Sequence, residues 1–128
     1  MFQIDFNSSI PIYEQIERQA RFLIASGAMP EGAPTPSVRE IAKLLTINPQ
    51  TVVKAYANLK LEGLLSPRRG QGFVVAEGAR EKCRRARREM FKTRIEDALA
   101  EAARGRLSKT EISEIVDEAL QKVFAEFY

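Results

Sequence analysis

The chain has 128 residues, with 20 Lys and Arg against 17 Asp and Glu, which gives a formal net charge of +3. It contains no His and a single Cys, so a Cys/His zinc site, a disulfide framework and a His-based catalytic triad are excluded. Carboxylates alone can bind Mg²⁺ or Ca²⁺, but the sequence has no calcium-loop motif. We therefore expect no metal and no cofactor, and because nothing resembles an active site we predict that the chain is not an enzyme.

The length fits one domain, or a small domain with an appendage. A composition of 45% hydrophobic and 29% charged residues is typical of a globular protein. The longest apolar runs are only a few residues long, and residues 1–5 do not resemble a signal peptide. We therefore expect no membrane span and a cytoplasmic location.

The first predicted helix begins at residues 9–11, because proline is tolerated in a first helical turn, where its missing N–H would be unpaired. Apolar residues then follow at helical spacing, and Gly27 marks the end of the helix. Prolines and glycines keep residues 30–36 irregular. A second helix starts after Ser37, which has with Glu40 the Ser-x-x-Glu spacing of a capping box. Its predicted buried residues are Ile41, Ala42, Leu44 and Leu45.

A third helix begins sharply after Ile47, because Asn48 is a good N-cap and Pro49 suits the first helical position. Gly63 ends this helix. Roughly three residues separate it from the helix before, which is the spacing of a helix-turn-helix. The predicted buried face of the third helix consists of Val52, Ala55, Tyr56 and Leu59.

Two short apolar segments, residues 64–66 and 73–75, flank the stretch 67–72 and predict a β-hairpin with a basic, glycine-rich tip. Pro67 fits this hairpin only if its strand lies at an edge. A helix, a helix-turn-helix and a hairpin in this order form a winged helix-turn-helix that ends near Val75.

A long amphipathic helix is predicted after the short joint at Glu77 and Gly78, and it stops at Gly105. A second Ser-x-x-Glu pair, Ser108 and Glu111, starts the last helix.

The predicted fold is therefore mainly α with a small β-hairpin wing. It comprises a winged helix-turn-helix DNA-binding domain over residues 1–76 and a two-helix dimerisation region over residues 77–128.

Each of the last two helices has one apolar stripe, and a two-helix hairpin cannot bury both stripes by itself. Pairing with a second copy is the simplest solution, since two-fold dimers are the commonest oligomers. The alternative is that the hairpin packs back on its own winged domain. The residues predicted to form the dimer interface are Met90, Phe91, Ile95, Leu99, Ile112, Ile115, Val116, Leu120, Val123 and Phe124.

Charge is distributed unevenly along the chain. Residues 80–94 contain eight basic residues and two acidic ones, whereas residues 1–79 are nearly neutral and residues 95–128 have a net charge of −4. The basic segment is either a solvated helix face or a surface that contacts phosphates or the acidic last helix of a partner subunit.

The winged fold places the start of the third helix in the major groove of DNA. Of its outward-facing residues, Gln50 can bond an adenine edge and Lys54 can reach a guanine edge or a phosphate. At the wing tip, Arg68 and Arg69 can bind phosphates or enter a narrow minor groove, and Gly70 permits close approach. The starts of the two helices, where free N–H groups suit phosphate oxygens, supply the remaining candidates, Ser37, Arg39, Asn48 and Thr51.

Several of these residues also have a purely structural interpretation. Ser37 and Asn48 are expected to cap their helices whether or not DNA is present. Arg39 can pair with Glu40 or another surface acid. Cys83, on the apolar side of its helix, is expected to be a small buried residue and not a redox sensor.

Four segments in this order resemble the GntR family of bacterial transcription regulators, and in particular its short YtrA subfamily. The segments are PIYEQI at 11–16, PSVREIA at 36–42, NPQTV at 48–52 and the stretch from Glu62 to Gly72. The resemblance covers residues 9–75 and implies two C-terminal helices for dimerisation. It also implies DNA contacts by Arg39, Gln50, Thr51, Lys54 and Gly70.

Three positions depart from the family pattern. Thr35 replaces the usual Leu, which predicts looser packing before the second helix. Val53 stands where relatives have a polar or basic residue, so an unusual DNA sequence is expected. Phe73 and Val74 replace the common Thr-Phe or Tyr-Phe pair, which predicts a shift in the packing of the hairpin.

The predicted function is that of a sequence-specific regulator, a homodimeric repressor that occludes a promoter by binding an inverted repeat in double-stranded DNA. Its half-sites would lie one helical turn, roughly 10 bp, apart. The alternative is a protein-interaction module, in which the winged fold is a scaffold and the C-terminal hairpin docks a partner. An unidentified small-molecule effector is left open, since no polar cluster marks a pocket.

Overall fold

The computed structural model describes residues 1–127, so Tyr128, the last residue of the predicted dimerisation region, lies outside the described part. The chain forms two compact units, which we call the N-terminal unit (Met1–Ala86) and the C-terminal unit (from Arg87 on). No helix within residues 1–127 has the length and apolar character needed to cross a membrane. The elements are, in chain order, α1 (Ile12–Ser26), α2 (Val38–Leu45), α3 (Pro49–Leu61), β1 (Leu65–Arg68), β2 (Gly72–Val75), α4 (Ala79–Arg104) and α5 (Lys109–Phe127).

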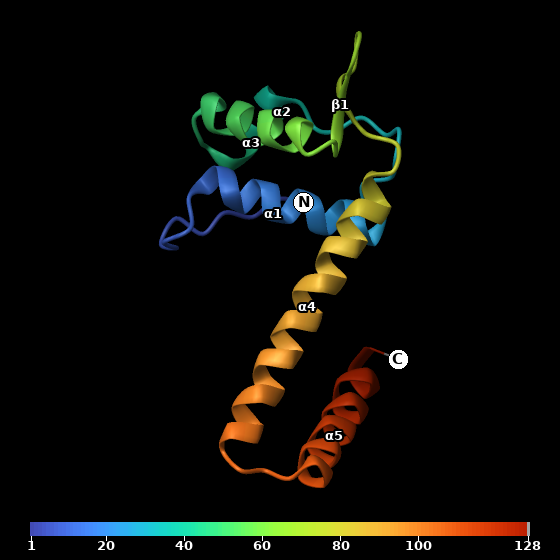
Figure 1. The fold of residues 1–128 in the computed structure, drawn as a ribbon. Helices are drawn as coiled ribbons and strands as arrows, with labels where there is room; N and C mark the ends of the chain where they lie inside the picture. Colours follow the sequence, from blue (N-terminus) through green and yellow to red (C-terminus); the bar gives the residue numbers. More distant parts are fainter. Residues whose placement is uncertain (128) are drawn as a thin grey trace. The chain divides into compact units, whose positions relative to one another are not determined.

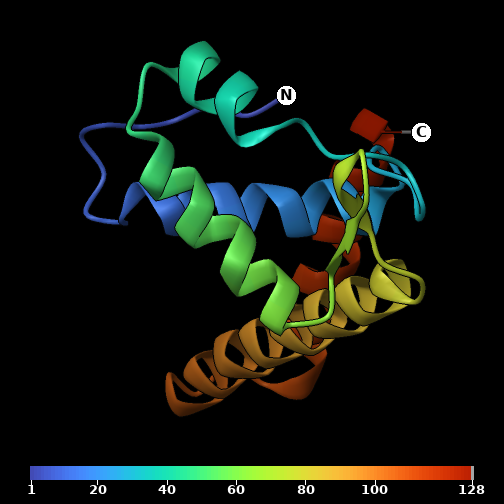
Figure 2. The same cartoon turned by 90° about the horizontal axis from the view of Figure 1, so that it is seen from above.

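The core of the N-terminal unit lies mainly between α1 and α3, which cross each other in the view from above (Figure 2). Each helix turns one apolar stripe toward this core, as its 3.6-residue spacing predicts. Pro11 is the N-cap of α1 and supplies no side-chain hydrogen bond, whereas Gly27 closes the helix in the left-handed conformation with a φ of 85°. The fully buried residues of the two stripes include Ile16, Ala20, Ile24, Val52, Ala55, Tyr56 and Leu59.

The predicted helix-turn-helix is confirmed, with three residues, 46–48, between α2 and α3. Ile41 and Ala42 are buried on the inner side of α2, as expected. The prediction for Leu44 is wrong, because its side chain is 68% exposed. Helix α2 has only eight residues and packs against α3 along one side, so its buried stripe is narrower than the apolar spacing suggests.

The wing is the antiparallel pair β1–β2, in which Leu65 is opposite Val75 and Arg68 is opposite Gly72. The segment before α2 runs along the other side of β2, where Gly32 N donates to Val75 O at 2.8 Å and Val75 N donates to Ala33 O at 3.0 Å. β1, which contains Pro67, is therefore the outer strand, where a residue without an N–H is tolerated.

Thr35 corrects one expectation drawn from the resemblance. Its side chain is 8% exposed, and both its backbone N–H and its Oγ1 donate to Phe73 O, at 2.9 and 3.1 Å. Phe73 in turn packs edge-to-face on Tyr56, with ring centroids 5.7 Å apart. Thr35 does not loosen the segment before α2; it joins that segment to the wing.

The N-terminal residues pack against α1 in a way that the sequence patterns did not indicate. Phe2 is buried in the core of the N-terminal unit. The buried amide of Gln15 accepts from Asp5 N at 2.9 Å and donates to Asp5 O and Ile10 O at 3.0 and 2.9 Å. One glutamine side chain thus replaces the backbone partners that an extended segment would find in a sheet.

The first turns of α4 belong to the N-terminal unit. Ala79 and Cys83 are buried in its core, so the expected burial of Cys83 is confirmed. Arg80 Nε donates to Ala25 O at 3.4 Å, and Lys82 Nζ donates to Glu62 O at 3.2 Å. These carbonyls lie at the C-terminal ends of α1 and α3, where cations are favoured.

The C-terminal unit consists of the second part of α4 followed by α5, which runs back antiparallel to it (Figure 1). Ser108 caps α5 by accepting a hydrogen bond from Glu111 N at 3.1 Å, as predicted. Gly105 follows the last residue of α4, but the left-handed residue of this turn is Arg106, with a φ of 67°.

Tyr56 allows a test of the contact between α3 and the segment before α2. Its hydroxyl donates to Pro36 O at 2.6 Å, and burial raises its pKa from the ordinary value of 10.0 to about 12. The unfolded chain loses the phenol proton near pH 10 and the folded chain near pH 12. The protonated phenol therefore contributes fully to the free energy of unfolding below pH 10, and this contribution is lost between pH 10 and pH 12.

We expect Tyr56→Phe to lower the free energy of unfolding at pH 7 by about 0.5–1.5 kcal/mol, because it removes one buried hydrogen bond. The variant should also lose less stability than wild type between pH 10 and pH 12. Urea unfolding at several pH values measures both effects. If the free energy of unfolding falls equally in wild type and in Tyr56→Phe between pH 10 and pH 12, the raised pKa does not belong to Tyr56.

Candidate nucleic-acid interface

Ser37 and Asn48 occupy the N-caps of α2 and α3. Ser37 Oγ accepts from Glu40 N at 3.1 Å, and Asn48 Oδ1 accepts from Gln50 N at 2.9 Å. Their predicted capping role is confirmed. Both residues are exposed, and each retains a polar hydrogen that the cap does not use.

The outward face of α3 carries Gln50, Val53 and Lys54, all of which are exposed. This orientation follows from the buried stripe on the opposite side of the helix, which fixes its rotation about its own axis. Thr51 is only half-buried and lies in the first turn, beside Asn48. The first two turns of α3 therefore present one amide side chain, Gln50, and one cation, Lys54, four residues apart.

Lys54 makes a contact that the sequence analysis missed. Its Nζ lies over the ring of Tyr13, 4.0 Å from the ring centroid, in a cation–π arrangement that joins α3 to the first turn of α1. Tyr13 lies in the segment PIYEQI that supports the family resemblance, but its sequence position gave no indication of this contact.

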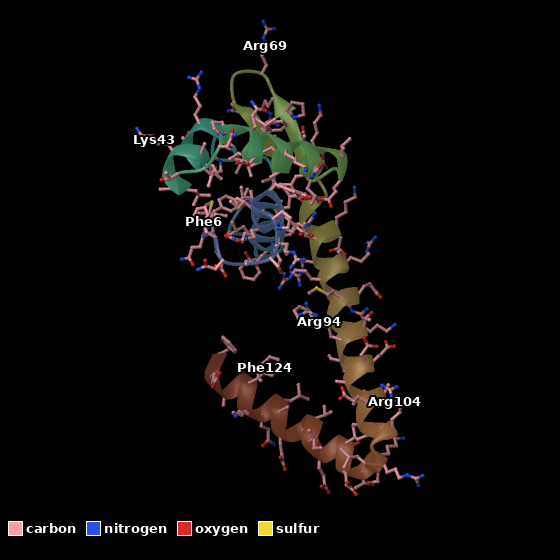
Figure 3. The ribbon with its side chains drawn as sticks, turned by 90° about the vertical axis from the view of Figure 1, so that its left-hand side faces the viewer. Phe6, Lys43, Arg69, Arg94, Arg104 and Phe124 are labelled. Atoms are coloured by element: carbon pink, nitrogen blue, oxygen red, sulfur yellow. The ribbon has the colours of Figure 1, made fainter. Side chains whose placement is uncertain are left out.

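Arg39 and Lys43 lie four residues apart on α2, and both are exposed. Lys43 was not among the predicted DNA-binding residues, although its spacing from Arg39 puts the two cations on one helix face. The side chain of Lys43 extends away from the unit in Figure 3. Among residues 1–127, Arg39 forms no ion pair with Glu40 or any other acid, so the structural alternative for this residue is not observed.

The wing carries its cations at the tip. Arg68 is the last residue of β1, and Arg69 begins the turn, from which its side chain extends outward (Figure 3). Gly70 has a φ of 81°, a conformation that other residues rarely adopt, and no atom lies within 4 Å of the position of a Cβ there. Gly70 thus both shapes the turn and leaves its surface open to close approach.

The cations of the N-terminal unit differ in whether they have acidic partners. On α1, Arg18 pairs with Glu14 at 3.5 Å, and Arg21 pairs with two acids, including Glu62 at 2.7 Å. None of the ion pairs found in residues 1–127 involves a cation of α2, of α3 or of the wing. Those cations are Arg39, Lys43, Lys54, Lys60, Arg68 and Arg69. The positive charge on these elements is therefore available to an external anion.

Most cations of the basic segment 80–94 have partners in their own chain. Besides the two that bind helix ends, Arg85, Arg88 and Lys92 pair with Glu81, Glu89 and Glu96 at 3.6, 3.6 and 3.9 Å. Arg87 and Arg94 lie over the ring of Phe91, at 5.5 and 5.6 Å. These contacts favour the interpretation of this segment as a solvated helix face.

The C-terminal unit exposes a continuous apolar surface. Of the residues predicted for the dimer interface, Leu99 and Ile112 are half-buried and the others are exposed, Ile95 by 57%. Helices α4 and α5 border an apolar groove of about 380 Å³. The groove is lined by Ile95, Ala98, Leu99, Ala102, Ile112, Ile115, Val116, Ala119, Leu120, Val123 and Phe124. No group of three or more acidic or Cys side chains placed to hold a metal ion occurs in residues 1–127.

Residues 12–75, which span α1 to the end of the wing, match the sequence profile of the family described as bacterial regulatory proteins, gntR family. The chain is also 40% identical over 102 residues to the HTH-type transcriptional repressor YtrA of Bacillus subtilis (strain 168), covering 80% of this chain and 78% of that protein. The chain belongs to the GntR family. It is a transcriptional regulator of the YtrA-like type, and the expectation that it is not an enzyme is confirmed.

Two solved structures share the fold of this chain. YtrA from Sulfolobus acidocaldarius, a GntR-family transcription factor, superposes with a TM-score of 0.58 at 35% identity, covering 95% of this chain and 98% of that one. AraR(DBD), solved in complex with operator ORX1, shares the fold with a TM-score of 0.53 at 24% identity, covering 59% of this chain and 95% of that one. The winged-helix fold and the two C-terminal helices are those of the predicted architecture.

Proposed function

We propose that this GntR-family regulator is a homodimeric repressor that binds an inverted-repeat operator in double-stranded DNA and acts in the cytoplasm. The observation that carries the proposal is the set of cations on α2, α3 and the wing, which are exposed and form no ion pairs within residues 1–127. Exposed cations without acidic partners, on both helices of a helix-turn-helix and at a hairpin tip, are the electrostatic signature expected of a surface that binds DNA phosphates.

In this proposal α3 enters the major groove with its first turn leading. Gln50 reads a base edge, because its amide Nε2 can donate to adenine N7 while its Oε1 accepts from the adenine N6 amino group. Lys54 reaches a guanine edge or a phosphate. The side chains at the two helix starts, together with free N–H groups, hold the flanking phosphates and fix the register: Ser37, Arg39, Asn48 and Thr51.

The wing adds contacts that do not depend on base sequence. Arg68 and Arg69 reach phosphates or a narrow minor groove, and Gly70 lets the backbone approach the duplex. Because Thr35 bonds strand β2 of the wing to the segment before α2, the wing and the two DNA-facing helices dock as one body.

The apolar surface of the C-terminal unit supports dimerisation. Exposed side chains as large as Ile95, Leu120 and Phe124 on adjoining helices are costly in a monomer. The groove between α4 and α5 is proposed to receive apolar side chains of a second copy, so we assign no small-molecule effector to it. A two-fold dimer then presents two winged units to half-sites roughly 10 bp apart, and occupancy of a promoter would block transcription.

We expect Gln50→Ala and Arg68→Ala to weaken DNA binding in different ways. Gln50→Ala should reduce the preference for the best duplex over a scrambled one, because it removes a base contact worth about 1–3 kcal/mol. Arg68→Ala should weaken binding to both duplexes by similar factors, because phosphates are the same in every sequence. Gel shifts with a duplex selected by the full-length protein from a random pool measure both ratios. Equal losses of preference in the two variants would contradict these roles.

We expect Leu120→Asp to convert the dimer into a monomer, because the change places a charge in the proposed interface. Light scattering should then give a mass near 14.4 kDa, against twice that mass for wild type. Leu61→Asp is the matched control, since Leu61 is 85% exposed at the end of α3, outside the apolar stripes. A stable dimer in Leu120→Asp would remove this part of the proposal.

A further inference from the structure

We propose that Tyr13 is a positioning residue for DNA recognition and acts through Lys54. The ring of Tyr13 holds the Lys54 ammonium at one defined place beside α3, so that the cation is already ordered when the duplex arrives. This inference rests on the proposed DNA-binding function, and Tyr13 itself is given no contact with DNA.

The geometry places the Tyr13 ring, which packs on the core, beneath the Lys54 ammonium. Tyr13 is half-buried and packs against the core of the N-terminal unit, whereas Lys54 is exposed on the outward face of α3. Lys54 Nζ lies 4.0 Å from the ring centroid, well inside the range of about 6 Å over which a ring attracts a cation. The packing of α1 against α3 fixes both backbones, so the Tyr13 ring stays within reach of the Lys54 side chain.

No other group found in residues 1–127 accounts for the position of this ammonium. The acid nearest in sequence to Tyr13, Glu14, is paired with Arg18 at 3.5 Å. Lys54 itself takes part in no ion pair within the described residues. The first turn of α1 is also the positive end of that helix, which disfavours a cation. The ring is therefore the attraction that holds Lys54 there.

An ordered Lys54 binds DNA at a lower entropic cost. Immobilising a long side chain in an interface costs about 0.5–1.5 kcal/mol, which corresponds to roughly twofold to tenfold in the dissociation constant. One side of the ammonium faces the ring, and its remaining N–H groups stay open to a phosphate or a guanine edge. The opposite possibility is that Tyr13 withholds Lys54 from DNA, and this predicts the opposite sign for the effect of removing the ring.

The test is a double-mutant cycle on full-length protein, read by fluorescence anisotropy with a labelled duplex selected by wild type from a random pool. The variants are Tyr13→Leu, which removes the ring, Tyr13→Phe, which keeps it, and Lys54→Met, each alone, and Tyr13→Leu combined with Lys54→Met. Thermal unfolding followed by circular dichroism checks that each variant is folded. A second readout is the upfield ring-current shift of the Lys54 side-chain protons in the NMR spectrum of free wild-type protein.

We expect Tyr13→Leu to weaken binding by about twofold to tenfold, and Tyr13→Phe to bind like wild type. In the Lys54→Met background, Tyr13→Leu should have no further effect. Tighter binding by Tyr13→Leu, an equal loss in Tyr13→Phe, or an undiminished loss without Lys54 would overturn the inference. Should Tyr13→Leu fail to fold, an unshifted Lys54 signal in wild type overturns it equally, and a shifted signal that Tyr13→Phe preserves supports it.

The proposed function fails separately. If wild type selects no duplex at all, DNA binding itself is contradicted, whatever the Tyr13 variants do. If wild type binds and only the pattern among the variants differs, the role of Tyr13 is wrong and the proposed function stands.

Discussion

The packing of α3 on α1 is the constraint on which the rest of the N-terminal unit depends. Val52, Ala55 and Leu59 are fully buried on one side of α3, so that side cannot turn outward without exposing the core. Gln50 and Lys54, on the opposite side of the helix, therefore face solvent. A core interaction therefore decides which side chains of α3 face solvent. Under the proposed function, substitutions in that core would weaken recognition without touching the duplex.

A second set of contacts makes the wing part of the same body. Tyr56, on the buried side of α3, donates a hydrogen bond to Pro36 O and packs against the ring of Phe73. The carbonyl oxygen of Phe73 accepts two hydrogen bonds from Thr35, one from its backbone N–H and one from its hydroxyl. The three elements that carry the exposed cations are thus joined by hydrogen bonds and one aromatic pair. Under the proposed function these contacts matter for recognition, because base contacts need a fixed register between α3 and the wing.

Local sequence signals predicted the helices, their three N-caps and the hairpin well, because each depends on residues close together in the chain. Ser37 and Asn48 cap the starts of α2 and α3, and Gly27 ends α1 in the left-handed conformation, as predicted. What the sequence could not supply were contacts between distant residues. The cation–π contact of Lys54 with Tyr13 and the hydrogen bonds of the Gln15 amide depend on tertiary packing. The spacing of apolar residues in the sequence does not predict them. The candidate DNA face was likewise predicted residue by residue, but the absence of ion pairs on it, within residues 1–127, is visible only in the structure.

The most direct test of the central claim, that the exposed cations meet phosphates, is the salt dependence of binding to a selected duplex. Counterion release predicts that the logarithm of the binding constant falls linearly with the logarithm of salt concentration, by about 0.9 per phosphate neutralised. We predict a steep slope that becomes shallower by about one when Arg69 is replaced by Ala. A flat dependence, or no retention of the protein on DNA, would contradict it and favour a protein-interaction module.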